Sequence, residues 1–185
     1  MVSWNVVLLV VCGLPATVLG CDWLQRYGRL NNDSLTLLKR MGKNITNREP
    51  PVHFPYPLYQ HIRHDEIQLV FIRETLELIL DLYHHDNLSS AGWDAVMSEH
   101  FQISIHRQIE ELGRCTKHST NRKLRRYFGK LKRRTLGSSG GSKESWELLW
   151  KQTKEHLCQL ELLVNHMTPQ LSWAVQINKT DKRTK

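Results

Sequence analysis

The stretch DEIQLVFIRETLELILDLYH, residues 65–84, decides the fold class of this chain. Its apolar residues recur three and four positions apart, which is the period of an α-helix. The main apolar stripe consists of Leu69, Ile72, Leu76, Ile79 and Tyr83. The polar line that remains is narrow and consists of Glu66, Arg73, Glu77 and Asp81. A helix that is apolar around most of its circumference is a buried helix, so this segment is predicted to form the centre of an all-α domain.

Four other segments show the same helical period, and strand signals are almost absent. They are residues 22–41, 91–114, 120–134 and 143–167. We expect Gly42 to end the first of these helices, Pro169 to end the last, and Ser89 or Ser90 to cap the helix at 91–114. Residues 43–64 hold four prolines and no sustained period, which predicts a long loop with a short turn around residues 59–63. Because a long first connection allows two successive helices to run parallel, we expect an up-up-down-down bundle of five main helices.

The first 20 residues have the pattern of a secretory signal peptide. They carry no charged side chain, and their apolar run at residues 6–11 is too short to span a bilayer. We expect cleavage after Gly20, secretion, and one extracellular domain over residues 21–185 without membrane insertion. The last residues of that domain, 170–185, are polar and basic and are predicted to form a flexible tail.

Four Asn-X-Ser/Thr tripeptides accompany this leader. Their acceptor residues are Asn32, Asn44, Asn87 and Asn178. Each is a candidate glycosylation site in the secretory pathway, which predicts an exposed position for each asparagine.

Three cysteines remain once Cys12 leaves with the leader: Cys21, Cys115 and Cys158. An odd number in an oxidising compartment indicates one bridge and one spare thiol, and three pairings are open. We favour Cys21–Cys115, because Cys158 falls on or near the buried side of a predicted helix, where an unpaired cysteine packs as a small hydrophobe.

The positive charge, +8 overall, is concentrated in the run RKLRRYFGKLKRR at residues 122–134. Its candidate polyanion-binding residues are Arg122, Lys123, Arg125, Arg126, Lys130, Lys132, Arg133 and Arg134. Two interpretations stay open: a solvated outer face of a bundle helix, or a surface for heparan sulfate or an anionic membrane. Nucleic acid is not an expected partner of a secreted chain.

The sequence contains no motif for catalysis, a metal or a cofactor. It has no glycine-rich phosphate loop, no His-Glu-x-x-His and no Gly-x-Ser-x-Gly. The histidines around His61 and His64 fall in a loop and at helix ends without a converging third ligand, so we expect no metal site.

Several short motifs occur in an order and spacing that suggest a family. They are Cys21-Asp-Trp-Leu, Phe54-Pro55, the segment 71–83, Ala91-Gly-Trp-Asp, Cys115, Arg125-Arg-Tyr-Phe128 and Ser145-Trp-Glu147. Over essentially the whole mature chain they resemble the type I interferons, most closely the teleost fish subgroup with two cysteines and a single disulfide bond. The resemblance implies a monomeric, non-enzymatic antiviral cytokine with a helical-bundle fold. Such a cytokine joins the two chains of a class II cytokine receptor and so starts kinase–transcription-factor signalling.

The same resemblance bears on the cysteines. It supports the bridge from Cys21 to Cys115. The second bridge of many family members is absent, because the loop has no cysteine and Glu144 stands where the family cysteine would be. Cys158 departs from the family pattern.

The resemblance also implies where the receptors bind. The higher-affinity receptor would contact the first helix, the long loop and the fifth helix, and the second receptor would contact the opposite face. Candidate contacts are Arg48, Trp150, Lys151, Glu155, Leu30 and Leu37. Trp150 lies at the edge of a buried stripe, so a core position and an exposed anchor both stay open. Glu155 departs from the basic residue often found at its position.

Two alternatives of a different kind remain on sequence grounds. One is a basic secreted helical protein that acts on glycosaminoglycans or membranes, and the other is a helical cytokine of another family. A membrane-active protein needs a contiguous apolar face beside its cations, whereas a receptor ligand needs a mixed surface.

Overall fold

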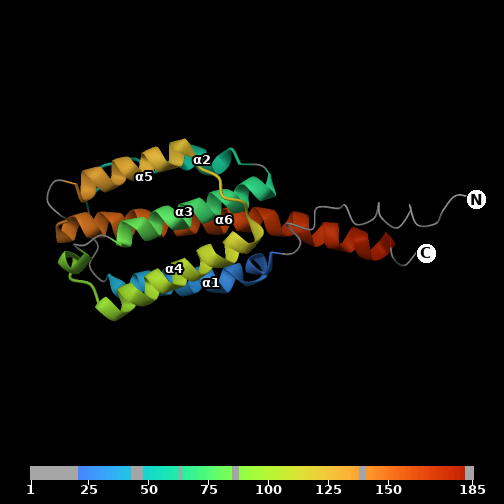
Figure 1. Ribbon diagram of the computed structural model, residues 1–185, viewed down its shortest axis with the longest axis horizontal. Helices are drawn as coiled ribbons and strands as arrows, with labels where there is room; N and C mark the ends of the chain where they lie inside the picture. The colour runs from blue at the N-terminus through green and yellow to red at the C-terminus, as the bar shows by residue number, and fades with distance from the viewer. Residues whose placement is uncertain (1–20, 43–47, 63, 85–87, 138–140, 182–185) are drawn as a thin grey trace, which may run out of the picture.

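The computed structural model describes residues 21–42, 48–62, 64–84, 88–137 and 141–181, with the side chains of Asp22 and residues 168–181 excepted. The predicted leader lies outside these residues. Five long helices and two short ones follow one another (Figure 1). They are α1 (Asp22–Met41), α2 (Tyr56–Gln60), α3 (Asp65–Tyr83), η1 (Leu88–Ala91), α4 (Ala95–Cys115), α5 (Arg122–Thr135) and α6 (Lys143–Asp181). The described residues contain no β-strand.

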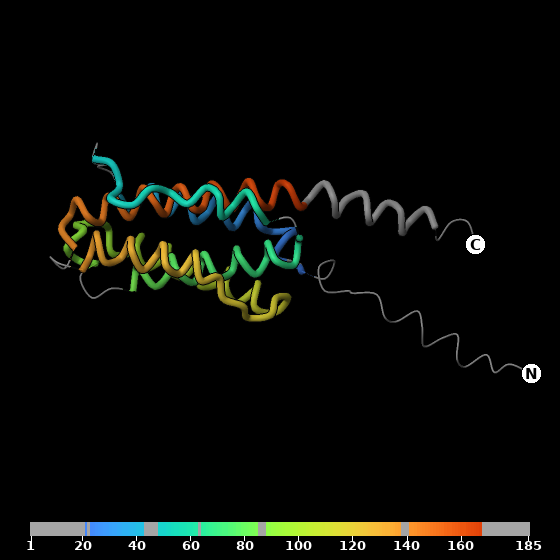
Figure 2. The backbone as a smooth tube through the Cα atoms, turned by 90° about the horizontal axis from the view of Figure 1, so that it is seen from above, coloured from blue at the N-terminus to red at the C-terminus, as the bar shows by residue number. Residues whose placement is uncertain are grey.

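The helices form the predicted up-up-down-down bundle. In Figure 1, α1 and α3 run in one direction, while α4 and α6 run in the opposite direction. Helix α3 contacts α4, α5 and α6, so the most apolar segment of the sequence lies at the centre. Helix α5 packs on one side of the α3–α6 pair, and α1 and α4 pack together on the other side. Figure 2 shows residues 48–62, the part of the long loop that includes α2, running alongside α6, with α5 in the opposite half of the bundle.

Two polar side chains set the starts of α4 and α5. Asp94 accepts a hydrogen bond from the Met97 amide (2.9 Å) and caps α4. The expected cap at Ser89 or Ser90 is therefore wrong, because Gly92, at φ 65°, turns the chain between η1 and α4. Asn121 caps α5 by accepting bonds from the Lys123 and Leu124 amides, both at 3.1 Å.

The C-terminal end of the bundle differs from the prediction. Helix α6 continues through Pro169 to Asp181, so the expected end at Pro169 is wrong. An interior proline removes one helical hydrogen bond and crowds the carbonyl four residues before it, at a cost of about 3 kcal/mol, but its fixed φ of about −65° is itself helical, so it does not by itself end a helix. Residues 170–181 of the predicted basic tail are helical.

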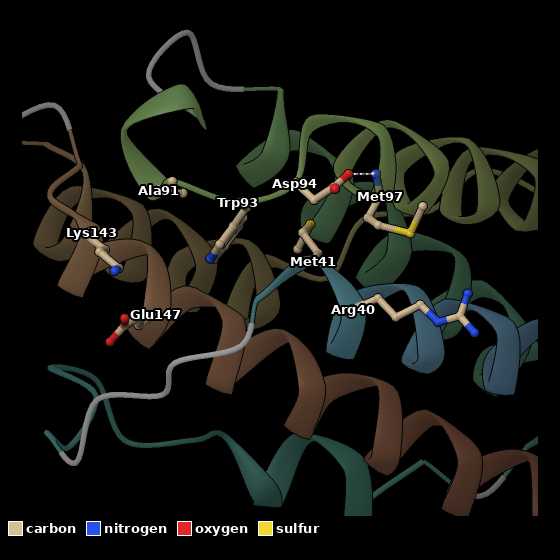
Figure 3. A pocket seen from close by; sticks show the side chains of 9 residues that line it. Arg40, Met41, Ala91, Trp93, Asp94, Met97, Lys143 and Glu147 are labelled. Carbon is tan, nitrogen blue, oxygen red and sulfur yellow. Dashed lines mark hydrogen bonds between the residues drawn. The ribbon is translucent and has the colours of Figure 1, made fainter.

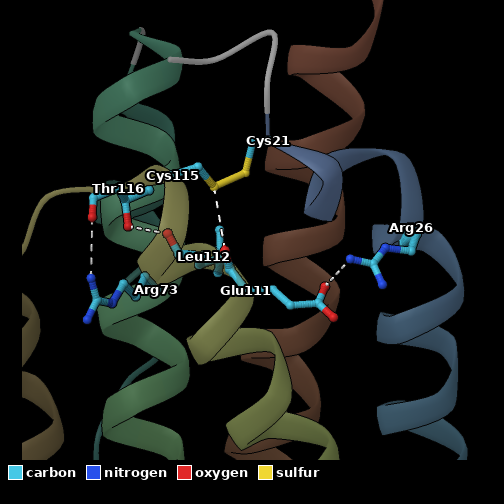
Figure 4. The surroundings of a disulfide bond; sticks show 7 residues. All are labelled: Cys21, Arg26, Arg73, Glu111, Leu112, Cys115 and Thr116. Carbon is cyan, nitrogen blue, oxygen red and sulfur yellow. Dashed lines mark hydrogen bonds and ion pairs between the residues drawn. A yellow bond between two sulfur atoms is a disulfide. The ribbon is translucent and has the colours of Figure 1, made fainter. Parts of the chain in front are cut away.

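A disulfide joins the start of α1 to the end of α4. Cys21 and Cys115 are bonded, with their Cα atoms 5.5 Å apart, which confirms the favoured pairing (Figure 4). Close to the bridge, Arg26 of α1 forms an ion pair with Glu111 of α4 at 3.0 Å. Cys158 is free and half-buried on α6.

A buried polar group continues the same α1–α4 seam. The Ser34 and Ser104 hydroxyl oxygens lie 2.8 Å apart, and Gln108 Nε2 donates to Ser34 Oγ at 3.0 Å. Ser34 is fully buried, and Gln108 is 1% exposed. These bonds satisfy Gln108 Nε2 and the two hydroxyl groups, while Gln108 Oε1 is buried without a hydrogen-bond partner, so the cost of burying the polar group is only partly offset.

Candidate receptor-binding surfaces

A cluster of aromatic rings holds the long loop against α6. The Phe54 ring lies 4.6 Å from the His156 ring, and the Tyr59 hydroxyl hydrogen-bonds His156 Nδ1. Phe128 of α5 stacks on the other side of His156 at 4.7 Å, and Tyr127 meets it edge-on at 5.4 Å. These contacts fix the position of the loop relative to α6. The exposed residues of the loop and of α6 are therefore held in a fixed arrangement.

His156 is fully buried within this cluster. Burial disfavours the charged imidazolium and lowers the pKa of His156 to about 3. Burial likewise raises the pKa of Tyr59 well above its ordinary value. The ring of His156 is therefore neutral at physiological pH and packs as an aromatic side chain.

Above the cluster, the loop and α6 share a polar surface. Lys151 Nζ donates to the Arg48 carbonyl at 3.2 Å, and the Tyr56 hydroxyl donates to Glu155 Oε1, also at 3.2 Å. Gln159 Nε2 donates to the same Glu155 oxygen at 3.1 Å. Three predicted contacts, Arg48, Lys151 and Glu155, thus lie together on one surface, which we call the loop–α6 face.

Tyr56 was not predicted as part of this face. It is 46% exposed, and slight desolvation together with the Glu155 charge raises its pKa. An exposed aromatic ring beside charged residues is typical of an interface anchor. No sequence signal marks Tyr56 as part of this face, because Tyr56 and Glu155 meet only when the loop packs on α6.

Two predicted contacts lie in the core instead. Trp150 is 5% exposed, and its indole Nε1 donates to the Leu38 carbonyl at 2.6 Å. The same carbonyl, in the last turn of α1, also accepts a hydrogen bond from the Gly42 amide at 3.4 Å, so the indole supplies it with a second donor. Leu30 is 6% exposed and also faces the core, so neither residue is available as an exposed anchor, and Leu37 is half-buried.

A second exposed surface lies on α4. Val96 and Ile103 are 55% and 57% exposed and lie seven residues apart, which is about two helical turns on one face. His100 and Arg107 are exposed beside them. We call this surface the outer face of α4; the apolar period of the sequence marks the buried stripe of this helix and not these two exposed residues.

The basic residues of α5 divide into two groups. Arg125 Nε lies 2.7 Å from Glu74 Oε1, and Lys132 Nζ lies 2.9 Å from Asp81 Oδ2. Arg134 donates to the Pro51 carbonyl at 2.8 Å. The other five cations form no ion pair within the described part of the chain. They are Arg122, Lys123, Arg126, Lys130 and Arg133.

Of the four glycosylation candidates, only the first can be placed. Asn32 is exposed on α1, as an acceptor must be. Asn44 and Asn87 lie outside the described residues, and for Asn178 only the backbone is described.

A hollow of about 460 Å³ opens at the end of the bundle away from the disulfide (Figure 3). Met41, Trp93 and Met97 contribute apolar surface to it, and Arg40 and Glu147 are among its charged residues. Among the described residues, no group of three His, Cys, Asp or Glu side chains converges on a possible metal position. No helix in the same residues is long and apolar enough to cross a membrane.

Comparison with known proteins identifies the family. A model of the Interferon alpha/beta domain matches residues 24–167, which span all five long helices except the start of α1 and the end of α6. Interferon a3 of Oncorhynchus mykiss is 36% identical over 172 residues, covering 90% of this chain and 98% of the trout protein. Interferon omega-1 of Homo sapiens is 26% identical over 107 residues, 55% of this chain and 54% of the human protein. The structure of zebrafish interferon 1 superimposes with a TM-score of 0.69 and 29% identity, covering 78% of this chain and 98% of that one. With the helical bundle and the Cys21–Cys115 bridge, these matches show that the chain belongs to the type I interferon family of cytokines and resembles its fish members.

Proposed function

We propose that the chain is secreted after removal of residues 1–20 and acts as a monomeric antiviral cytokine. It brings together the two different chains of a class II cytokine receptor on the cell surface and thereby starts kinase–transcription-factor signalling. The observation that carries this proposal is the family match over residues 24–167, which covers nearly all of the helical core. The cytokine needs no cofactor and catalyses no reaction.

The loop–α6 face is the proposed site for the higher-affinity receptor chain. Arg48 and Tyr56 are exposed, and Lys151 and Glu155 are half-exposed beside them. Hydrogen bonds from Lys151 to the Arg48 backbone carbonyl and from Tyr56 to Glu155 hold the loop backbone and the Lys151, Tyr56 and Glu155 side chains before any partner binds. A surface ordered in advance loses less conformational entropy on binding, which favours affinity.

The outer face of α4 is the proposed site for the second receptor chain. Val96 and Ile103 point away from the core, with polar neighbours around them. A small apolar centre within a polar rim is the usual anatomy of a protein interface. A face on α4 and a face on the loop and α6 leave room for two receptor chains to bind one cytokine at once.

A reporter assay tests the proposal. Purified residues 21–185 are applied to cultured fish cells that carry an interferon-responsive promoter. The first variant, Arg48→Ala/Lys151→Ala, truncates the loop–α6 face, and the second, Val96→Asp/Ile103→Asp, places charges on the outer face of α4. The control, Arg114→Ala/Lys117→Ala, removes two exposed cations at the connection between α4 and α5.

We expect induction by the wild type at low concentration. Each face variant should need a concentration about ten or more times higher for the same induction, because interface anchors contribute about 2 kcal/mol or more each to binding. The control should match the wild type. Absence of induction by folded wild-type protein would refute the cytokine function. A loss of induction in the control equal to that in the face variants would refute the assignment of receptor binding to these two faces.

A further inference from the structure

The five unpaired cations of α5 form one continuous surface, which we call the basic face: Arg122, Lys123, Arg126, Lys130 and Arg133. At about 100° per residue, they fall within an arc about 100° wide. This arc lies opposite the buried stripe of Leu124, Tyr127, Phe128 and Leu131. Along the helix the face extends over about 17 Å.

The other three cations of α5 are used within the fold. Arg125 and Lys132 point toward α3, where they meet Glu74 and Asp81. Arg134 points toward the loop and bonds the Pro51 carbonyl. Within α5, the cations that contact no other element of the fold are thus confined to the basic face.

Helix stability explains only one of these residues: Arg133, in the last turn of α5, is favoured by the helix dipole. Helix α5 contains no acidic residue, and its first turn holds Arg122 and Lys123. Cations near a helix N-terminus oppose the helix dipole and cost about 0.3–1 kcal/mol each. Mutual repulsion along the face adds to this cost, so a partner of opposite charge is the feature that would make the arrangement favourable.

The side chains on α5 distinguish between the possible anionic partners. All four large apolar residues of the helix are buried, so α5 offers nothing to insert into a bilayer. Its two aromatic rings, Tyr127 and Phe128, are buried as well and cannot stack on nucleic-acid bases. A straight, exposed row of ammonium and guanidinium groups instead suits a linear polymer that carries its charge in sulfate groups.

We propose that the basic face of α5 binds a linear sulfated glycosaminoglycan of the kind found at cell surfaces. Such binding would hold the secreted protein near the cells that release or receive it. The proposal does not depend on receptor binding, because it rests on the charge and exposure of α5 alone.

The first experiment compares two variants of equal net charge on a heparin column. One variant, Arg122→Gln/Arg126→Gln/Lys130→Gln/Arg133→Gln, removes four cations from the basic face. The control variant, Arg29→Gln/Lys39→Gln/Arg114→Gln/Lys117→Gln, removes four exposed cations from other parts of the bundle. Both bring the formal net charge from +8 to +4, since 8 − 4 = 4.

We expect the basic-face variant to elute at clearly lower salt. At an ionic strength of about 0.15 M, its affinity for heparin should be lower than that of the wild type by a factor of about ten or more. The control variant should elute close to the wild type. Equal weakening of the two variants would overturn the proposal, because net charge alone would then explain heparin binding.

A second measurement uses the unaltered protein, so it does not depend on how any variant folds. Lysines of the wild type are acetylated with and without heparin, and each is followed by mass spectrometry. Heparin should protect Lys123 and Lys130 and leave Lys39 and Lys117 reactive. Uniform protection of all four lysines would contradict the proposed site.

The same protein is then offered vesicles that contain phosphatidylserine and, separately, double-stranded DNA. We expect heparin to bind more tightly than either at about 0.15 M ionic strength. Tighter binding to the vesicles or to DNA, with the basic-face variant impaired, would overturn the choice of a sulfated polysaccharide.

Discussion

The two sides of α3 are held together by different chemistry. On one side, α1 and α4 are joined by the Cys21–Cys115 bridge and by hydrogen bonds among buried polar side chains such as Ser34 and Gln108. On the other side, the loop, α5 and α6 meet in aromatic rings packed around the neutral His156. The first seam depends on oxidation, whereas the second depends on the protonation state of one imidazole.

This difference has a consequence for binding. Arg48 and Tyr56, on the loop–α6 face, belong to the loop that the aromatic cluster holds in place. A change that protonates His156 therefore acts directly beneath that face, while reduction of the disulfide acts on the opposite side of α3. The two seams can be weakened separately. In order of expected effect, the substitutions below begin with one in the core that both seams share and continue with changes confined to a single seam.

The largest effect is expected at Leu76, which α3 places in the core shared by both seams. Leu76 is 1% exposed, so Leu76→Asp would bury a charge without a partner. The cost should reach about 5 kcal/mol or more, which is the lower end of the stability typical of a domain, and the protein should not fold. Circular dichroism of the purified variant checks this, with the exposed Asp81→Ala as control. A cooperative thermal transition in Leu76→Asp would place the segment outside the core.

Removal of the bridge should have the next largest effect, confined to the α1–α4 seam. The bridged residues are 94 positions apart. Cys21→Ser/Cys115→Ser should lower the free energy of unfolding by about 4–5 kcal/mol in the chain-entropy model. Urea denaturation measures the change, and Cys158→Ser, which alters the free cysteine, serves as control. A double variant as stable as the control would mean that the bridge does not constrain the unfolded chain.

Acid should weaken the aromatic cluster. The pKa of His156 is about 3 in the folded chain, below the ordinary value of 6.5. The unfolded chain therefore takes up a proton first, so the stabilising contribution is complete above pH 6.5 and is lost as the pH falls toward 3. Between pH 6.5 and 4.5 this loss amounts to about 3 kcal/mol, at about 1.4 kcal/mol per pH unit.

The variant His156→Gln isolates this effect, because glutamine keeps a polar side chain but does not titrate. Denaturation at pH 7 and pH 4.5 should show a drop in the wild type that is larger than the drop in the variant by about 3 kcal/mol. Equal drops in the two proteins would show that the imidazole is not responsible.

The smallest of these effects is expected from the polar group of the α1–α4 seam. Ser34→Ala leaves Gln108 Nε2 without its partner, which should lower the free energy of unfolding by about 1–3 kcal/mol. The measurement uses protein made without glycosylation, because Ser34 also completes the Asn32 tripeptide. Ser119→Ala, at an exposed position, should change stability by less than about 0.5 kcal/mol. Equal values for the two variants would mean that the hydrogen bonds make no net contribution.

The features that the sequence predicted well are those set by local pattern. The bounds of α1 and the central position of α3 follow from the apolar period, because burial of a helical face needs that period. The features it missed depend on contacts between distant segments. Trp150 is buried because α1 packs against α6 and accepts its indole hydrogen bond, and Tyr56 belongs to the loop–α6 face because the loop packs on α6. The basic run was recognised as a whole, but only the packing of α3 and the loop against α5 separates its paired cations from its unpaired ones.

Competition between variants tests most directly the proposal that this cytokine joins two receptor chains through two faces. Cells carrying the interferon-responsive reporter receive a fixed, half-maximal dose of wild-type protein together with increasing amounts of Val96→Asp/Ile103→Asp. That variant keeps the loop–α6 face, so it should occupy the higher-affinity receptor without recruiting the second chain and should suppress induction by the wild type. Arg48→Ala/Lys151→Ala, which lacks the face for the higher-affinity receptor, should suppress it far less at the same concentration. Absence of suppression by a large excess of the folded α4 variant would contradict the two-face account.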